Sequence, residues 1–194
     1  MRALYLTYGN QSGVVQKVIE IFQSSEIDVD VFNAAEKLHF RYEKVKFPRI
    51  SFFNFFNFII SLYQFKSRWK AGYLRTDFAY SVMSKKCVYE LSKKKYDFAF
   101  QSGVLFGLPS KYISLPYFLG IIDNTYLIGK KGHRREVGLK LTRKFINEEK
   151  RVYAFADKIF VMSNHVRKSL IEDYGVDSER IIVTGICPNV LPDS

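Results

Sequence analysis

The last third of the sequence alternates helical and strand patterns in a fixed order, and this order restricts the fold more than any other feature. Residues 158–162 (KIFVM) form a short, nearly all-apolar run, as expected of a strand buried on both faces. A helical pattern precedes this run, a second helical pattern ends at Gly175, and another apolar run follows at 180–184 (RIIVT). This succession predicts a parallel βαβ crossover, the repeating unit of a doubly wound α/β sheet.

Four further strands are predicted upstream, and helical patterns separate them. They lie at residues 2–7, 28–32, 96–101 and 116–122. The helical patterns begin after Gly13, cover residues 52–70 and 77–91, and lead up to Ala156. A chain of 194 residues has room for one α/β domain with a substantial core but not for two. The sequence therefore predicts a single α/β domain with a parallel sheet and helices on both faces.

Charge is distributed unevenly along the chain. The formal net charge is +11, and residues 41–75 contain eight lysine and arginine residues but a single acid, Glu43. Residues 85–95 and 130–151 are also basic. A polarised basic surface favours a polyanionic partner, which is a nucleic acid, an anionic membrane or a phosphate-bearing substrate.

Cysteine usage and the N-terminus point to a reducing compartment. Cys87 and Cys187 form no spacing typical of a zinc site or of a disulfide framework, so we expect no metal. The N-terminal MRALYLTYG is typical of a strand and lacks the pattern of a signal peptide. No run of about 18 apolar residues is present. These features favour a cytoplasmic protein.

An ordered set of residues near the C-terminus resembles the end of the N-terminal domain of family 4 retaining glycosyltransferases. In those enzymes two Rossmann-like domains face each other across a cleft, which is the GT-B architecture. The matching residues are Glu149, Ala156, Asp157, Ser163, Tyr174, Gly175, Arg180 and Gly185. The resemblance implies a Rossmann-like acceptor-binding domain over residues 1–185 and, at 186–194, the start of a linker to a donor-binding domain.

The resemblance also implies a function. The full enzyme would transfer a hexose from a nucleotide sugar to a glycan or lipid-linked acceptor, in bacterial cell-surface polysaccharide synthesis at the inner face of the membrane. It would need no metal and no cofactor beyond the nucleotide-sugar donor, which the second domain would bind. The isolated domain is expected to be inactive, because donor positioning and water exclusion need both walls of the cleft.

The turn after the first strand is the first candidate for the cleft. A strand, a glycine-containing turn and a helix together place backbone N–H groups where phosphate or carboxylate binds readily. The residues concerned are Gly9, Asn10, Gln11, Ser12 and Gly13. Alternatively, the glycines only permit the turn. Their G-x-x-x-G spacing differs from the G-x-G-x-x-G fingerprint of dinucleotide-binding proteins.

The fourth predicted strand is followed by a second candidate group, Asp123 and Asn124. Asp123 would be a catalytic base, a ligand of an acceptor hydroxyl, or only a helix N-cap. The resembling family often has a histidine-containing turn here, whereas Ile122 precedes the aspartate in this chain. A basic, glycine-bearing loop follows, and it would receive an acceptor phosphate or pyrophosphate. Its members are Lys130, Lys131, His133, Arg134 and Arg135.

The fifth predicted strand leads into Ser163, Asn164 and His165. Ser163 matches the family serine and would serve as a helix N-cap, as a ligand contact, or as both. Glu149 falls on the apolar face of the preceding helix. A carboxylate at such a position needs a partner, and we expect a cationic side chain or backbone N–H groups to provide it.

Residues 52–70 (FFNFFNFIISLYQFKSRWK) predict an unusual helix, because its polar residues form one thin stripe among large apolar ones. Such a helix is either buried on nearly all sides, in a core or between domains, or it lies in a bilayer interface. For the second alternative, the expected interface residues are Phe55, Phe58, Tyr63, Lys66, Arg68, Trp69 and Lys70.

Two other classes of function are compatible with the composition. A basic nucleic-acid-binding domain would suit the net charge of +11, but the aromatic residues fall mostly at core positions and no RNA- or DNA-binding signature is present. A dinucleotide-binding enzyme would suit the fold but lacks the glycine fingerprint. The expected partners are therefore a nucleotide sugar, a glycan or lipid-linked acceptor and an anionic membrane surface, not a nucleic acid.

Overall fold

A computed structural model describes residues 1–9, 14–37, 52–108, 114–121, 139 and 141–185. Six parallel strands form one sheet in the order β2-β1-β3-β4-β5-β6. The strands are β1 (Arg2–Thr7), β2 (Asp28–Asn33), β3 (Phe98–Ser102), β4 (Tyr117–Ile121), β5 (Lys158–Val161) and β6 (Ile181–Val183). The predicted Rossmann-like α/β fold with a parallel sheet is confirmed, and each predicted strand is present within two residues of its expected start. The predicted linker at 186–194 lies outside the described residues.

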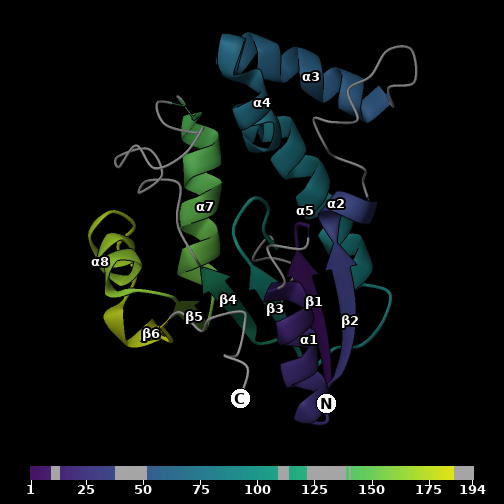
Figure 1. Cartoon of the computed structure of the whole chain (residues 1–194), viewed down its shortest axis with the longest axis vertical. Helices are drawn as coiled ribbons and strands as arrows, with labels where there is room; N and C mark the ends of the chain where they lie inside the picture. Colours follow the sequence, from purple (N-terminus) through teal and green to yellow (C-terminus); the bar gives the residue numbers. More distant parts are fainter. Residues whose placement is uncertain (10–13, 38–51, 109–113, 122–138, 140, 186–194) are drawn as a thin grey trace, which may run out of the picture.

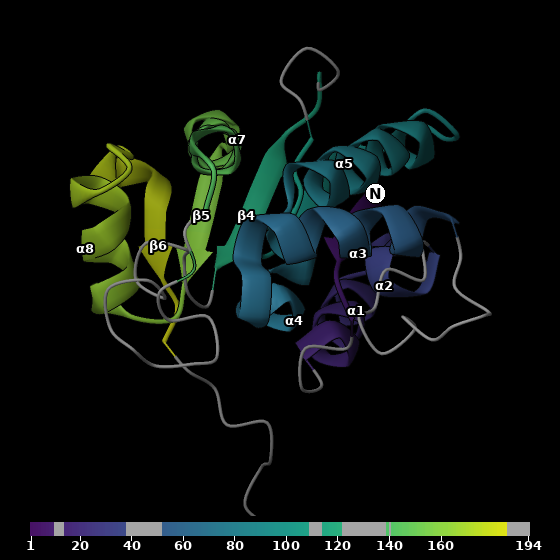
Figure 2. The same ribbon diagram turned by 90° about the horizontal axis from the view of Figure 1, so that it is seen from above.

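Helices cover both faces of this sheet (Figures 1 and 2). The helices α5 (Asp77–Leu91) and α7 (Arg143–Phe155) lie side by side on one face, and α1 (Val14–Ser24) lies on the other. The helix α8 (Asn164–Glu172) packs against β5 and β6. Parallel neighbours need a crossover connection, and this is usually a helix, because the chain must return to the same end of the sheet before the next strand pairs.

The main core lies between the sheet and the pair α5 and α7. Alternate side chains of the strands, such as Leu4, Leu119 and Ile159, meet Met83 of α5 and Tyr153 of α7 there, and all are almost fully buried. On the opposite face the aromatic rings of the strands contact α1. The Phe22 ring of α1 packs edge-on against the rings of Tyr5, Phe98 and Phe100, with centroids 5.8–6.4 Å apart.

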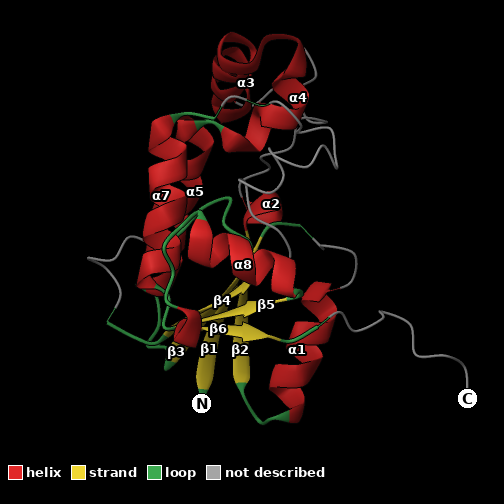
Figure 3. Cartoon of the chain, turned by 90° about the vertical axis from the view of Figure 1, so that its left-hand side faces the viewer, coloured by secondary structure: helices red, strands yellow, loops and turns green. Residues whose placement is uncertain are grey.

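A separate helical layer stands off from the sheet. It consists of α3 (Phe52–Phe65), the 3-10 turn η3 (Lys66–Arg68), α4 (Trp69–Gly72) and the turn η4 (Tyr73–Arg75), which leads directly into α5. In Figures 1 and 3, α3 and α4 lie beyond one end of the pair α5 and α7. This end of the pair is the one farther from the amino-terminal edge of the sheet. The short helix α2 (Ala34–Lys37) follows β2 on the same side.

Of the two alternatives for the Phe-rich helix, burial on nearly all sides in the core of this chain is wrong; burial against another domain and insertion in a bilayer interface stay predictions. In α3 the polar residues Asn54, Asn57 and Ser61 are buried, with exposed fractions of 0–2%, and Phe65 at the end of the helix is the apolar residue buried with them. The large apolar side chains Phe52 and Tyr63 instead point outward, with exposed fractions of 75% and 89%. The reason is that the neighbouring segment offers buried hydrogen-bonding groups to this helix, so its polar stripe turns inward.

Candidate functional site

The carboxyl ends of the six strands gather at one edge of the sheet, because all five strand pairs are parallel. The chain leaves β1 toward β2 on one side, and the later strands are added on the other side, beginning with β3. This reversal makes the β1–β3 boundary a topological switch point. In open α/β sheets the crevice at such a point is the usual place for a ligand. We therefore consider the carboxyl edge the candidate site.

The corner between β1 and β2 is formed by Gly9 and Asn33. Gly9 has a left-handed backbone conformation, with φ of +68°, and its N–H donates to the Asn33 side-chain oxygen over 2.9 Å. The same oxygen accepts from the backbone N–H of Ala35, and the Asn33 amide group donates to Glu36. Space beside Gly9 is open, since a Cβ added there would meet no atom within 4 Å. The glycine is thus required by its backbone angle, and one side of the turn remains accessible.

The end of β3 carries a buried polar network. The Gln101 side chain is fully buried, and its amide nitrogen donates to the carbonyl oxygens of Gly103 and Phe106 over 2.7 and 2.6 Å. Its amide oxygen accepts from the Tyr117 hydroxyl over 2.6 Å. Gln101 therefore holds the loop that follows β3 in a fixed conformation. Sequence reasoning placed Gln101 at the end of a strand but gave it no role.

A hydroxyl pair lies on the other face of the sheet at the same edge. The hydroxyls of Tyr5 and Ser102 are 2.9 Å apart. Burial raises the pKa of Tyr5, while the hydrogen bond to Ser102 acts in the opposite direction. The phenol is therefore neutral at physiological pH and is suited to hydrogen bonding rather than to carrying charge.

At the end of β5, Ser163 is the N-cap of α8. Its side-chain oxygen accepts from the backbone N–H of Val166 over 3.3 Å. The predicted N-cap role is confirmed, and a ligand contact by this serine stays a prediction. Asn164 and His165 begin the helix and are exposed. Strands β1 and β5 are three places apart in the sheet, so Gly9 and Ser163 are separated by roughly 14 Å at the usual strand spacing.

Several predicted site residues lie outside the described residues. They are Asn10, Gln11, Ser12, Gly13, Asp123, Asn124, Lys130, Lys131, His133, Arg134 and Arg135. The structure describes the strands that precede these residues in the sequence: β1 ends at Thr7, and β4 ends at Ile121. Both strands have their carboxyl ends at the candidate edge.

The predicted membrane-interface residues divide between the two sides of the helical layer. Tyr63, Lys66 and Lys70 are exposed, as are Phe55 and Arg68. Phe58 and Trp69, however, are only partly exposed, and they pack edge-on at 4.9 Å and against the core. The structure therefore does not place these two rings on the outward face. The outward apolar residues that sequence reasoning missed are Phe52, Phe53, Phe56 and Ile59.

The residues that carry the family resemblance have structural roles in the scaffold. Glu149 is fully buried on α7 and accepts from the hydroxyls of Tyr153 and Tyr174 over 3.2 and 2.7 Å. These tyrosine partners were not among the expected ones. The Arg180 side chain donates to the carbonyl oxygens of Tyr153, Ala154 and Ala156, at the C-terminal end of α7. A cation at this end also interacts favourably with the helix dipole.

Two more residues of the pattern fix strand and helix ends. The Asp157 carboxylate accepts from the backbone N–H of Tyr117 over 2.7 Å, at the amino edge of the sheet and thus opposite the candidate site. Gly175 ends the α8 region with φ of +71°, which favours glycine. The pattern therefore specifies how α7, β5, α8 and β6 fit together, and it indicates fold rather than chemistry.

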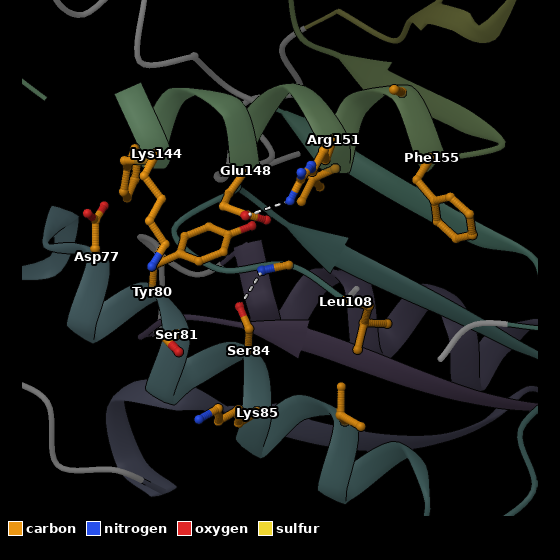
Figure 4. Close-up of a pocket in the computed structure, with 15 residues that line it drawn as sticks. Asp77, Tyr80, Ser81, Ser84, Lys85, Leu108, Lys144, Glu148, Arg151 and Phe155 are labelled. Carbon is orange, nitrogen blue, oxygen red and sulfur yellow. Dashed lines mark hydrogen bonds and ion pairs between the residues drawn. The ribbon is translucent and has the colours of Figure 1, made fainter. Parts of the chain in front are cut away.

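A groove of about 710 Å³ lies between α5 and α7, and Gly107 and Leu108, which follow the loop held by Gln101, also line it (Figure 4). Its polar groups largely satisfy one another. The Arg151 guanidinium lies 2.9 Å from the Glu148 carboxylate, and the Ser84 hydroxyl accepts from the backbone N–H of Gly107 over 3.1 Å. None of the residues predicted for the cleft lines this groove. We do not assign a ligand to it.

No three side chains of His, Cys, Asp or Glu within the described part of the chain lie close enough together to hold a metal ion. No described helix has the length and apolar character needed to cross a bilayer.

The fold and edge define a Rossmann-like α/β domain, and comparison with known proteins agrees with this class. No protein-family model and no curated protein sequence matches the chain. Among solved structures, the UDP-N-acetylglucosamine 2-epimerase from Rickettsia bellii is similar over 95% of this chain, with a TM-score of 0.51 and 14% sequence identity. The chain spans 45% of the length of that protein. At this identity the likeness establishes the fold alone.

Proposed function

We propose that this chain is the acceptor-side domain of a nucleotide-sugar-dependent glycosyltransferase of the retaining type. In this proposal the carboxyl edge of the sheet forms one wall of the cleft, and a second domain binds the donor. The hexose passes to a hydroxyl of a glycan or lipid-linked acceptor.

The observation that carries the proposal is the arrangement of the carboxyl edge. Gly9, Asn33 and the loop held by Gln101 flank the switch point, and Gly9 leaves its side open. The structural neighbour is a UDP-N-acetylglucosamine 2-epimerase, so the shared fold is compatible with a nucleotide-sugar substrate, and this chain spans less than half of that protein. The ordered resemblance over residues 149–185 is the reason for proposing transfer, and the test below separates transfer from epimerisation.

Asp123 is the residue we propose for the acceptor hydroxyl. It follows β4 in the sequence by two residues, and β4 ends at the candidate edge. A carboxylate there would accept a hydrogen bond from the hydroxyl that attacks the sugar, or would take its proton. The basic residues at 130–135 would hold an acceptor phosphate.

The test uses the 194-residue chain alone and the same chain together with a donor-binding domain, either fused to it or added as a separate protein. Each is incubated with radiolabelled UDP- and GDP-hexoses and with a lipid extract, and labelled lipid or glycan is measured. We expect transfer only when the second domain is present, with the anomeric configuration of the donor retained in the product.

Asp123→Asn is the informative variant, and Asp97→Asn is its matched control. Asp97 immediately precedes β3 and lies at the opposite edge, where its carboxylate accepts from the backbone N–H of Arg2 over 2.7 Å. We expect Asp123→Asn to lower transfer by about 100-fold or more, and Asp97→Asn to leave it within about twofold once the folded fraction is matched. A change of sugar configuration without any transfer would indicate an epimerase and overturn the proposal.

A further inference from the structure

The helix α3 presents an apolar face to solvent. Phe52, Phe56, Ile59 and Tyr63 follow one another at steps of three or four residues, so they form one stripe along the helix. Their exposed fractions are 75%, 45%, 48% and 89%. In ordinary surface helices the stripe at this spacing faces the core, and the polar residues face water. The orientation of α3 is therefore the reverse of the usual one.

Hydrogen bonds on the inner side fix this orientation. The Asn57 amide nitrogen donates to the backbone oxygen of Tyr73 over 2.7 Å, and the Asn57 amide oxygen accepts from the Thr76 hydroxyl. The Tyr73 hydroxyl in turn donates to the side-chain oxygen of Asn54 over 2.7 Å. All four residues are buried. Rotation of α3 would leave these groups without partners, so the outward apolar stripe is built into the fold.

The segment that carries this face has charges of one sign only. Residues 52–76 contain Lys66, Arg68, Lys70 and Arg75 and no aspartate or glutamate. The first three follow α3 directly and are exposed. No ion pair joins Lys66 or Lys70 to a carboxylate among the described residues. The Lys70 ammonium instead lies 5.7 Å from the centre of the Trp69 ring.

We propose that α3 is a membrane-docking helix, which lies flat in the headgroup region of an anionic bilayer with its outward stripe in the acyl boundary. Aromatic and aliphatic residues on one face with lysine and arginine at the end of the helix are what such an interface requires. Residues 52–76 carry cations and no carboxylates, which complements the anionic headgroups of such a bilayer. The inference rests on α3 and its surroundings and does not depend on sugar transfer.

The location of α3 gives this docking a consequence. The helix lies on the side of the molecule toward which the arrowheads of β1 and β2 point (Figure 1). A bilayer bound to α3 would therefore be on the same side as the carboxyl edge. A substrate anchored in that bilayer would approach the edge without leaving the membrane.

The test measures binding of the 194-residue chain to sedimented vesicles of phosphatidylcholine alone and of phosphatidylcholine with 30 mol% phosphatidylglycerol, a fraction of about one third chosen to give a strongly anionic surface. We expect binding to the anionic vesicles and at least about tenfold weaker binding to the neutral ones. The variant Phe52→Ser/Ile59→Ser/Tyr63→Ser should lose about 100-fold or more in partition coefficient, because three large apolar groups no longer enter the acyl boundary.

Matched variants separate docking from general surface properties. Ile21→Ser/Tyr89→Ser removes two apolar side chains with exposed fractions of 60% and 54% on α1 and α5, and it should bind like the unchanged chain. Lys66→Gln/Lys70→Gln should weaken binding by about tenfold or more. Lys95→Gln/Lys168→Gln, which removes two exposed lysines elsewhere, should have a much smaller effect.

A fluorescent probe reports the depth of insertion. Tyr63→Trp should show a blue-shifted emission and quenching by brominated lipid on anionic vesicles, whereas Tyr89→Trp should not. Absence of vesicle binding, or binding that the α3 serine variant leaves unchanged, would overturn the proposal. So would a concentration-dependent dimer that the same variant abolishes, because the stripe would then be a self-association surface.

Discussion

The Tyr174 hydroxyl donates a 2.7 Å hydrogen bond to the Glu149 carboxylate, and this contact joins the end of α8 to the middle of α7. Glu149 is fully buried. A hydrogen bond to a charged group contributes about 1.5–3 kcal/mol to stability. If the Tyr174 hydroxyl is removed, water cannot replace it as a donor, because the Glu149 carboxylate is buried. Tyr174→Phe should therefore lower the free energy of unfolding by about 1.5–3 kcal/mol, measured by urea denaturation.

The control for this prediction is Glu172→Gln, two residues earlier. Glu172 is exposed and lies 3.7 Å from the Lys168 ammonium. Solvent-exposed pairs of this kind contribute little, so the variant should stay within about 0.5 kcal/mol of the unchanged chain. Equal effects of the two variants would contradict a structural role for the buried contact.

Asn57→Ala should detach or loosen α3. The substitution removes the Asn57 donor to the backbone oxygen of Tyr73 and the Asn57 acceptor of the Thr76 hydroxyl, and both residues are fully buried. We expect a loss of about 2–4 kcal/mol in unfolding free energy, together with faster amide hydrogen exchange in α3 than in α5. Tyr63→Ala, on the exposed face of the same helix, should change stability by less than about 0.5 kcal/mol. Equal protection of α3 in both variants would argue against the hydrogen-bond network.

Gly9→Ala tests the backbone requirement at the candidate edge. The φ angle of +68° disfavours any residue with a Cβ, although no atom would clash with that Cβ. We expect a destabilisation of about 1–2 kcal/mol and a similar value for Gly175→Ala, where φ is +71° and space is also open. Gly9→Asn should cost less, since asparagine tolerates this region better. Neutral behaviour of Gly9→Ala in thermal unfolding would contradict the turn geometry.

The free energy of unfolding should fall at alkaline pH, because the buried Tyr73 phenol opposes loss of its proton in the folded chain. Burial raises the pKa of Tyr73 from its ordinary value of 10.0 to about 12. A group with a raised folded-state pKa binds its proton more tightly in the folded chain, so its stabilising contribution is complete below pH 10 and is lost as pH rises through 12. Urea denaturation between these pH values should show a steeper decline for the unchanged chain than for Tyr73→Phe. Parallel declines would contradict this assignment.

Much of the scaffold could be predicted from local patterns. The runs at β1 and β5 are short and apolar because parallel strands are covered on both faces, and such runs are visible without any long-range information. The helix α5 was predicted at its observed bounds, Asp77–Leu91. The N-cap role of Ser163 also followed from the sequence, since the donor that it accepts from is only three residues away.

The orientation of α3 could not be predicted in this way. Its periodicity indicates which residues share a face, but it does not say which face meets the protein. That depends on Tyr73 and Thr76, whose buried polar groups bond to Asn54 and Asn57 across 19 residues of sequence. The Tyr174 partner of Glu149 was missed for the same reason, because Tyr174 lies in the turn after α8, 25 residues away. Tyr153, by contrast, lies only four residues from Glu149 on the same helix, at a spacing that the sequence shows.

The sequence by itself determined the six strands and their parallel direction. It therefore also determined that their carboxyl ends meet at one edge of the sheet. Only the tertiary structure decided that the outer helix turns its asparagines inward and its phenylalanines outward. The physical reason is that the periodicity of apolar residues and the direction of the chain are local properties. Which face of a helix is buried depends instead on the hydrogen-bonding groups that a distant segment places beside that helix.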